Sequence, residues 1–138
     1  MSLRTLFDVR LRADPAELKG LREMVREAAV QAGCDGAMVS ELVLAINEAC
    51  MNVIQHAYGG EPNQEMAVTM STEGSTLVCR IEDNASPANL DAIKPRALDE
   101  LRPGGLGTHF MAELMDDCQY GHLRNQAGNF LEMRKKIT

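Results

Sequence analysis

The chain has 138 residues, about the length of one domain and too short for two ordinary ones. Hydrophobic residues make up 45% of it and charged residues 25%, a composition typical of soluble globular proteins, and we expect no membrane span. Lys and Arg total 14 against 20 Asp and Glu, and the net charge of -6 disfavours direct binding to nucleic acid. Four widely spaced cysteines and no secretory signal predict a cytoplasmic protein with reduced thiols and without a zinc site.

The first half of the chain predicts one strand followed by two helices. Apolar and polar residues alternate up to Ala13, as they do in a strand. Asp14 is then a good N-cap for a first helix, which runs to Ala32. A second, longer helix is predicted from a cap at Asp35 to the pair Gly59–Gly60, and its wide apolar face indicates a central position in the fold.

The second half predicts two pairs of strands separated by a long connection. Alternating residues on both sides of a turn at Gly74 predict a hairpin that ends near Asp83. Residues 86–107 are rich in proline and glycine and predict a mobile connection, after which strands are expected at 118–124 and 129–137. This order predicts an α+β fold: a two-layer α/β sandwich whose mixed, mostly antiparallel sheet carries helices on one face.

Three polar residues lie on one face of the second predicted helix. Glu48, Asn52 and His56 follow one another at intervals of four, so they project from successive turns. The amide oxygen of Asn52 can ligate Mg²⁺, and the carboxylate of Glu48 can act as a general base. By itself the same pattern is also typical of a solvated helix face.

Two later segments carry further candidate ligand contacts. Asp83 ends a strand, where its carboxylate can accept a hydrogen bond from an amine such as the N6 group of adenine; the alternative is an ordinary turn residue. A glycine cluster then runs into a predicted helix, and its backbone amides can bind phosphate oxygens. The alternative there is a flexible hinge. This cluster and the hydroxyl residue that follows it are Gly104, Gly105, Leu106, Gly107 and Thr108.

Together and in this order, these segments resemble the N, G1 and G2 boxes of the GHKL, or Bergerat-fold, ATPases. The Glu-x-x-x-Asn-x-x-x-His-Ala-Tyr pattern at 48–58 and the short single domain look most like the bacterial anti-sigma-factor serine kinases. The resemblance implies that Glu48 is the general base, Asn52 the Mg²⁺ ligand and Asp83 the adenine contact. It also places His56, Ala85 and residues 104–108 at the nucleotide site, with Gly105 and Gly107 in an ATP lid that spans about 86–107.

The resemblance further implies an activity and its partners. By that analogy the chain, one domain over 1–138, uses ATP and Mg²⁺ to phosphorylate a serine of an anti-anti-sigma (STAS-domain) protein. It would also sequester a sigma factor, and members of this group often form homodimers. None of these partners follows from composition or periodicity.

One position departs from the family pattern and keeps a second function class open. The G1 box reads Asp83-Asn84-Ala85, where the family has glycine at the third position. A methyl group there can crowd the base or reshape the turn, since glycine permits closer approach and other φ values. The alternative to an active kinase is therefore a partner-binding module on the same fold that has lost its nucleotide. The presence of Glu48 and Asn52 favours the kinase, because chemistry needs them and folding does not.

Overall fold

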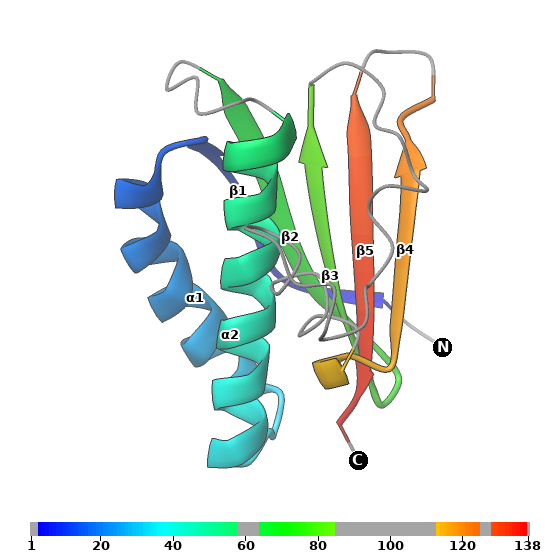
Figure 1. The fold of residues 1–138 in the computed structure, drawn as a ribbon. Helices are drawn as coiled ribbons and strands as arrows, with labels where there is room; N and C mark the ends of the chain where they lie inside the picture. Colours follow the sequence, from blue (N-terminus) through cyan, green and yellow to red (C-terminus); the bar gives the residue numbers. More distant parts are fainter. Residues whose placement is uncertain (1–2, 58–63, 85–112, 125–127, 138) are drawn as a thin grey trace, which may run out of the picture.

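The computed structural model of the chain describes residues 3–57, 64–84, 113–124 and 128–137. Over these ranges the protein is a two-layer α+β sandwich, as predicted, in which one sheet carries two helices on one face (Figure 1). The five described strands follow the order β1-β2-β3-β5-β4. Every pair among the described strands is antiparallel, in agreement with the mostly antiparallel sheet that the sequence predicts. Two of these pairs, β2–β3 and β4–β5, join consecutive described strands.

The N-terminal strand leads into the first helix through a tight turn. Strand β1 (Leu3–Arg12) is followed by Asp14, whose Oδ1 accepts a hydrogen bond from the Ala16 amide at 3.0 Å. That cap starts a single 3₁₀ turn, Pro15–Glu17, and α1 (Leu18–Gln31) begins only after it. The predicted N-cap is therefore confirmed, and the α-helix starts one turn later than the sequence suggested.

The second helix begins as predicted, and its helical type changes near its C-terminal end. Asp35 Oδ1 accepts from the Met38 amide at 2.8 Å and caps α2 (Gly36–Asn52). Residues Val53–Ala57 continue the helix as a π-helical turn, η2. The predicted end at Gly59–Gly60 lies outside the described residues. Consecutive β-branched residues at 53 and 54 disfavour a regular α turn there.

Helix α2 is central and strongly apolar. In the described part of the chain, Gly36–Gln55 is the one helix long and apolar enough to cross a membrane, judged by length and composition. Six of its residues are buried in the core, and Arg22 of α1 donates to Asn47 Oδ1 at 3.0 Å across the helix pair. Packing therefore accounts for the apolar residues on its inner face, while Leu44 stays 42% exposed. The buried residues of α2 are Val39, Leu42, Ala45, Ile46, Ala49 and Cys50.

The other four strands complete the sheet beneath the helices. They are β2 (Glu65–Glu73), β3 (Thr76–Asp83), β4 (Asp117–His122) and β5 (Asn129–Lys136). The predicted turn between β2 and β3 is confirmed, with Gly74 at a φ of 61°. Alternate side chains of these strands face the helices and form the core. These are Met66, Val68, Met70, Leu77, Cys79, Ile81, Leu131 and Met133.

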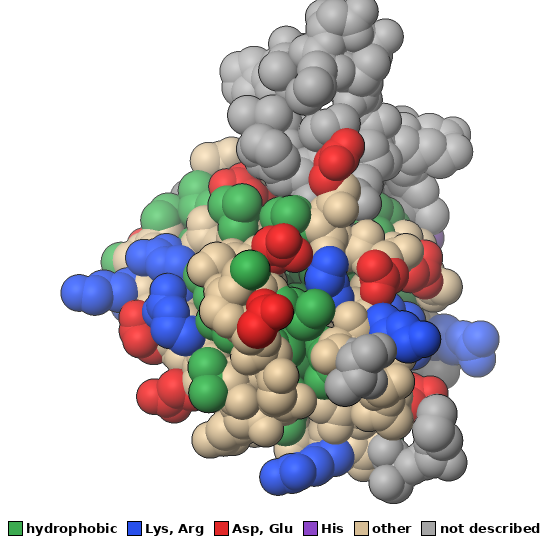
Figure 2. All heavy atoms as spheres, turned by 90° about the horizontal axis from the view of Figure 1, so that it is seen from below, with side chains coloured by type: hydrophobic (Ala, Val, Ile, Leu, Met, Phe, Trp, Pro, Cys, Tyr) green, Lys and Arg blue, Asp and Glu red, His purple; other side chains and the backbone are tan. Residues whose placement is uncertain are grey.

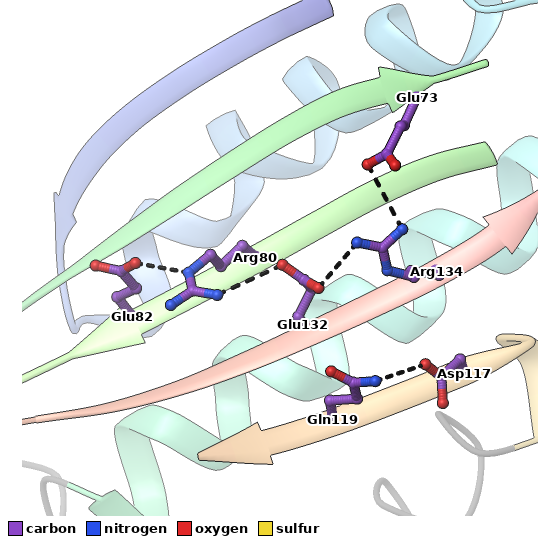
Figure 3. Close-up of polar contacts among 7 residues, drawn as sticks. All are labelled: Glu73, Arg80, Glu82, Asp117, Gln119, Glu132 and Arg134. Carbon is purple, nitrogen blue, oxygen red and sulfur yellow. Dashed lines mark hydrogen bonds and ion pairs between the residues drawn. The ribbon is translucent and has the colours of Figure 1, made fainter. Parts of the chain in front are cut away.

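The opposite face of the sheet carries a ladder of alternating charges (Figure 3). Arg80 Nε lies 2.7 Å from Glu82 Oε2, and Arg80 Nη1 lies 3.4 Å from Glu132 Oε1. Arg134 continues the ladder, with Nη2 3.2 Å from Glu132 Oε2 and Nη1 3.7 Å from Glu73 Oε2. The ladder thus runs from β5 over β3 to β2, and each of its charges lies beside a charge of opposite sign.

Charges of both signs also mix at the lower end of the molecule. Seen from below, Lys and Arg side chains alternate with Asp and Glu (Figure 2). The described residues on that face show no broad basic area of the kind that a nucleic acid backbone requires.

The four cysteines are free thiols whose surroundings disfavour the thiolate. Burial raises the pKa of Cys50 to about 12 and holds the pKa of Cys79 well above 9.0. Burial, with a smaller contribution from Asp117, raises the pKa of Cys118 to about 11. Burial also raises the pKa of Cys34 from 9.0, although this thiol is only partly covered. None of the four is activated as a nucleophile.

We expect truncation of two leucines of α2 to change the free energy of unfolding by very different amounts. Leu42 is 0% exposed and Leu44 is 42% exposed. Leu42→Ala removes buried atoms and leaves a cavity, so it should lower the free energy of unfolding by about 2–5 kcal/mol. Leu44→Ala should change it by less than about 0.5 kcal/mol. Urea denaturation followed by circular dichroism measures both, and equal losses would contradict the orientation of α2.

Thiol burial predicts an order of alkylation and a pH dependence. At pH 8, iodoacetamide should modify Cys34 first and Cys118 more slowly, and should reach Cys50 and Cys79 only on unfolding. Timed alkylation with peptide mass spectrometry tests this order, and a urea-unfolded sample is the control. Early labelling of Cys50 in the native protein would refute the order.

The buried thiol of Cys50 also predicts a pH dependence of stability. Unfolded thiols ionise near a pKa of 9.0, while folded Cys50 stays neutral up to a pKa of about 12. The contribution of Cys50 to the free energy of unfolding, fully present below pH 9, should therefore be lost as the pH rises from 9 towards 12.

Candidate functional site

The candidate residues gather at one end of the two layers. Asn52 is the last residue of α2, Asp83 is the last residue of β3, and Asn129 is the first residue of β5. Figure 1 shows these three element ends at the same, upper end of the molecule. Helix α2 also contacts β3. Residues that are far apart in the sequence are thus brought to one edge of the fold.

The helix supplies one half of the candidate site. Glu48 and Asn52 lie one turn apart on α2 and are both half-buried. Because residues at i and i+4 share a face, a carboxylate and a carboxamide project side by side. Both residues therefore lie on one helix, as predicted, and their roles at the site remain predictions.

The backbone of His56 lies in a different kind of helical turn from that of Glu48 and Asn52. Its backbone lies in the π-helical turn η2, so the regular α spacing from Glu48 through Asn52 does not extend to it. A π turn closes through bonds to the fifth residue and often occurs at functional sites. The structure describes the backbone of His56 and not its side chain.

The sheet supplies the other half through a buried carboxylate. Strand alternation turns Cys79, Ile81 and Asp83 towards the helices, and Asp83 is 6% exposed. Asn129 pairs with Asp83 across the strands, and its Nδ2 donates to Asp83 Oδ1 at 2.9 Å. Burying a carboxylate is costly unless donors surround it, and Asn129 supplies one such donor. The position of Asp83 at the end of β3, level with the end of α2, keeps it a candidate ligand contact.

Two residues of this half escaped the sequence analysis. Gly128 has a φ of 138°, and a Cβ at this position would clash with the carbonyl oxygen of Asp83. Asn129 begins β5 and is itself buried. A usable signal was present, because asparagine is depleted from strands and its appearance at the start of an apolar strand calls for a polar partner.

The remaining predicted contacts lie outside the described residues. They are Ala85, Gly104, Gly105, Leu106, Gly107 and Thr108, together with the connection 86–107. The described part of the site is therefore the pair on α2 and the carboxylate on β3.

The oxygen-bearing side chains of the candidate site suit a Mg²⁺ ion whose remaining ligands are substrate phosphates and water. Among the described residues no group of three or more His, Cys, Asp or Glu side chains can hold a metal ion alone. Mg²⁺ is commonly bound through one or two protein oxygens while substrate phosphates and water complete its shell. The side-chain oxygens of Glu48 and Asn52 suit that role, and the buried Asp83 suits recognition of an amine.

A cavity of about 210 Å³ lies at the same end of the sheet as Asp83. Its lining includes Met66, which pairs with Asp83 across β2 and β3, and Asn84, which directly follows Asp83. Arg10, Ala67 and Glu82 form a cross-strand row in the same lining, on the face of the sheet opposite Asp83. The cavity therefore adjoins the candidate site.

Comparisons with known proteins agree with this architecture. A family model described as "Histidine kinase-like ATPase domain" matches residues 11–135. The chain is 25% identical to Serine-protein kinase RsbW of Bacillus subtilis over 140 residues, which covers 96% of this chain and 86% of that protein. The protein of the same name from Oceanobacillus iheyensis is 25% identical and is covered to 90%. The one from Listeria innocua is 31% identical over 99 residues, 66% of this chain and 63% of that protein.

Solved structures show the same fold. The crystal structure of the RsbU and RsbW domains of a Mycobacterium tuberculosis protein matches with a TM-score of 0.67 at 14% identity, covering 99% of this chain and 32% of that one. The histidine kinase domain of a blue-light activated kinase from Erythrobacter litoralis matches with a TM-score of 0.54 at 16% identity, covering 89% and 60%. This chain thus spans about a third of the first and under two thirds of the second. With a family model that matches 11–135, the chain belongs to the histidine kinase-like ATPase domain family.

Proposed function

We propose that the chain is an ATP-dependent serine-protein kinase and anti-sigma factor. It transfers the γ-phosphate of ATP to a serine of an anti-anti-sigma (STAS-domain) protein, and it sequesters a sigma factor. The observation that carries the proposal is the arrangement of Glu48 and Asn52 on α2 at the same end of the fold as the buried Asp83. Similarity over most of the chain to proteins named Serine-protein kinase RsbW supports it.

Asp83 recognises the base in this proposal. Its carboxylate accepts hydrogen bonds only, and the 6-amino group of adenine donates them. Guanine carries an oxygen at that position, which cannot donate a hydrogen bond to the Asp83 carboxylate. The burial of Asp83 therefore favours adenine over guanine.

Asn52 and Glu48 act on the phosphate end. When bound, Mg²⁺ supplies charge neutralisation for the phosphates, and the side-chain oxygen of Asn52 is its protein ligand. Glu48 accepts the proton of the substrate serine as the serine oxygen bonds to the γ-phosphorus and the bond to the ADP oxygen breaks. Their separation of one helical turn is suited to two adjacent roles, and Glu48 remains half-buried.

The rest of the proposal comes from the sequence. Residues 86–107 form a lid over ATP, in which the amides of 104–107 and the hydroxyl of Thr108 contact phosphate, and His56 and Ala85 adjoin the nucleotide. The chain acts as one domain, in the cytoplasm and as a homodimer. The sheet face opposite the helices is covered by no described element, which leaves room for a second copy.

A charge-neutral substitution tests the general base. Glu48→Gln keeps the shape of the side chain and removes its ability to take a proton. We expect phosphate transfer from radiolabelled ATP to a cognate STAS-domain protein to fall by about 10²–10⁴-fold, with ATP affinity changed only slightly. Glu41→Gln, on the same helix and in an ion pair with Lys135, is the matched control and should leave transfer intact. Transfer by Glu48→Gln at the wild-type rate would rule out this mechanism.

Calorimetric titration with ATP, with and without Mg²⁺, tests the nucleotide site. We expect Mg²⁺-dependent binding by the wild type and loss of the Mg²⁺ dependence in Asn52→Ala, because the side-chain oxygen that ligates the ion is gone. Ala85→Gly should bind more tightly, since it removes the methyl group that crowds the base. No binding by the wild type, with recovery in Ala85→Gly, would instead support a partner-binding module that has lost its nucleotide.

A further inference from the structure

The hydrogen bond between Asp83 and Asn129 joins two buried polar side chains in a mostly apolar core. Asp83 is 6% exposed and Asn129 is 7% exposed. They lie opposite each other on β3 and β5, at the edge where α2 also ends. The separation of Asn129 Nδ2 and Asp83 Oδ1 is 2.9 Å.

The chemistry of the two groups fixes the direction of this bond. A carboxylate offers acceptors alone, so the carboxamide of Asn129 must present its N–H₂ group to Asp83. A hydrogen bond to a charged acceptor is stronger than one between neutral groups. It therefore restrains the rotation of the Asp83 carboxylate and decides how its plane is turned towards a ligand.

The backbone around Asn129 is held close to Asp83 as well. Gly128 sits at a φ of 138°, and a Cβ there would clash with the Asp83 carbonyl oxygen. The Leu123 amide donates to the Gly128 carbonyl oxygen at 3.0 Å and ties the end of β4 to the start of β5. Asn129 thus reaches Asp83 from a fixed main chain, which makes the pair a preformed unit.

We propose that Asn129 is a positioning residue for base recognition: it aims the Asp83 carboxylate at the 6-amino group of a purine and so makes the site selective for aminopurine nucleotides. The inference rests on the proposed function, in which Asp83 contacts adenine. A purely structural Asn129 would satisfy a buried carboxylate and affect every nucleotide equally. A positioning Asn129 affects only nucleotides that carry the amino group.

The test compares ATP with purine riboside triphosphate, which lacks the 6-amino group, by calorimetric titration in the presence of Mg²⁺. We expect the wild type to prefer ATP by about tenfold or more, the range for a hydrogen bond to a charged group. In Asn129→Leu, which has similar volume and no amide, that preference should fall to within about twofold. The ratio of the two affinities does not depend on how much of the protein is folded.

Two additions keep the test decisive. Arg134→Met removes ion pairs from the same strand on the opposite face of the sheet, and it should keep the wild-type preference. Nuclear magnetic resonance of the unaltered chain is the second measurement: the Asn129 side-chain amide signals should shift on adding ATP far more than on adding purine riboside triphosphate. This measurement requires no variant to fold.

The outcomes separate the inference from the function on which it rests. Lost preference in Asn129→Leu alone, with the amide shift, supports it. An unchanged preference in Asn129→Leu, or equal amide shifts with the two nucleotides, overturns the positioning role and leaves the adenine contact intact. Equal affinity of the wild type for both nucleotides overturns the adenine contact of Asp83 and the positioning role together.

Discussion

A carboxylate on the buried face of a sheet is the constraint around which the candidate site is built. Asp83 continues the row of Cys79 and Ile81 that packs under the helices, yet it carries a group that favours water. It is tolerated because it stands at the end of β3 and receives the Asn129 amide. The close approach of Gly128 belongs to the same arrangement, since any larger residue would push β5 away.

The core determines where the chemistry lies. Helix α2 is held on the sheet by its apolar face, and this packing carries its last turn to the edge where Asp83 is found. Glu48 and Asn52 are positioned by that rigid helix and not by a loop, which suits groups that act on a ligand together. Apolar packing, together with the Glu41–Lys135 ion pair between α2 and β5, thus sets the relation between the two halves of the site.

Local signals were sufficient for most of the fold. The caps at Asp14 and Asp35 and the turn at Gly74 each depend on a residue and its immediate neighbours, and all three are seen in the structure. Periodicity predicted the strands and the α+β class for the same reason. The change from an α-helix to a π turn after Asn52 was not predicted, because hydrophobic spacing does not distinguish the two kinds of helical turn. Family resemblance, and not periodicity, supplied the roles of Glu48, Asn52 and Asp83.

The sequence by itself determined which residues form helices and strands and that Glu48 and Asn52 share a helix face, because these features involve neighbours within one or two turns of chain. Only the tertiary structure decided that Asp83 is buried, that Asn129 is its donor and that both lie at the end of α2. Those relations depend on the register between β3 and β5 and on the packing of α2 against the sheet. Register and packing are set by the whole core at once, so no local pattern of residues encodes them.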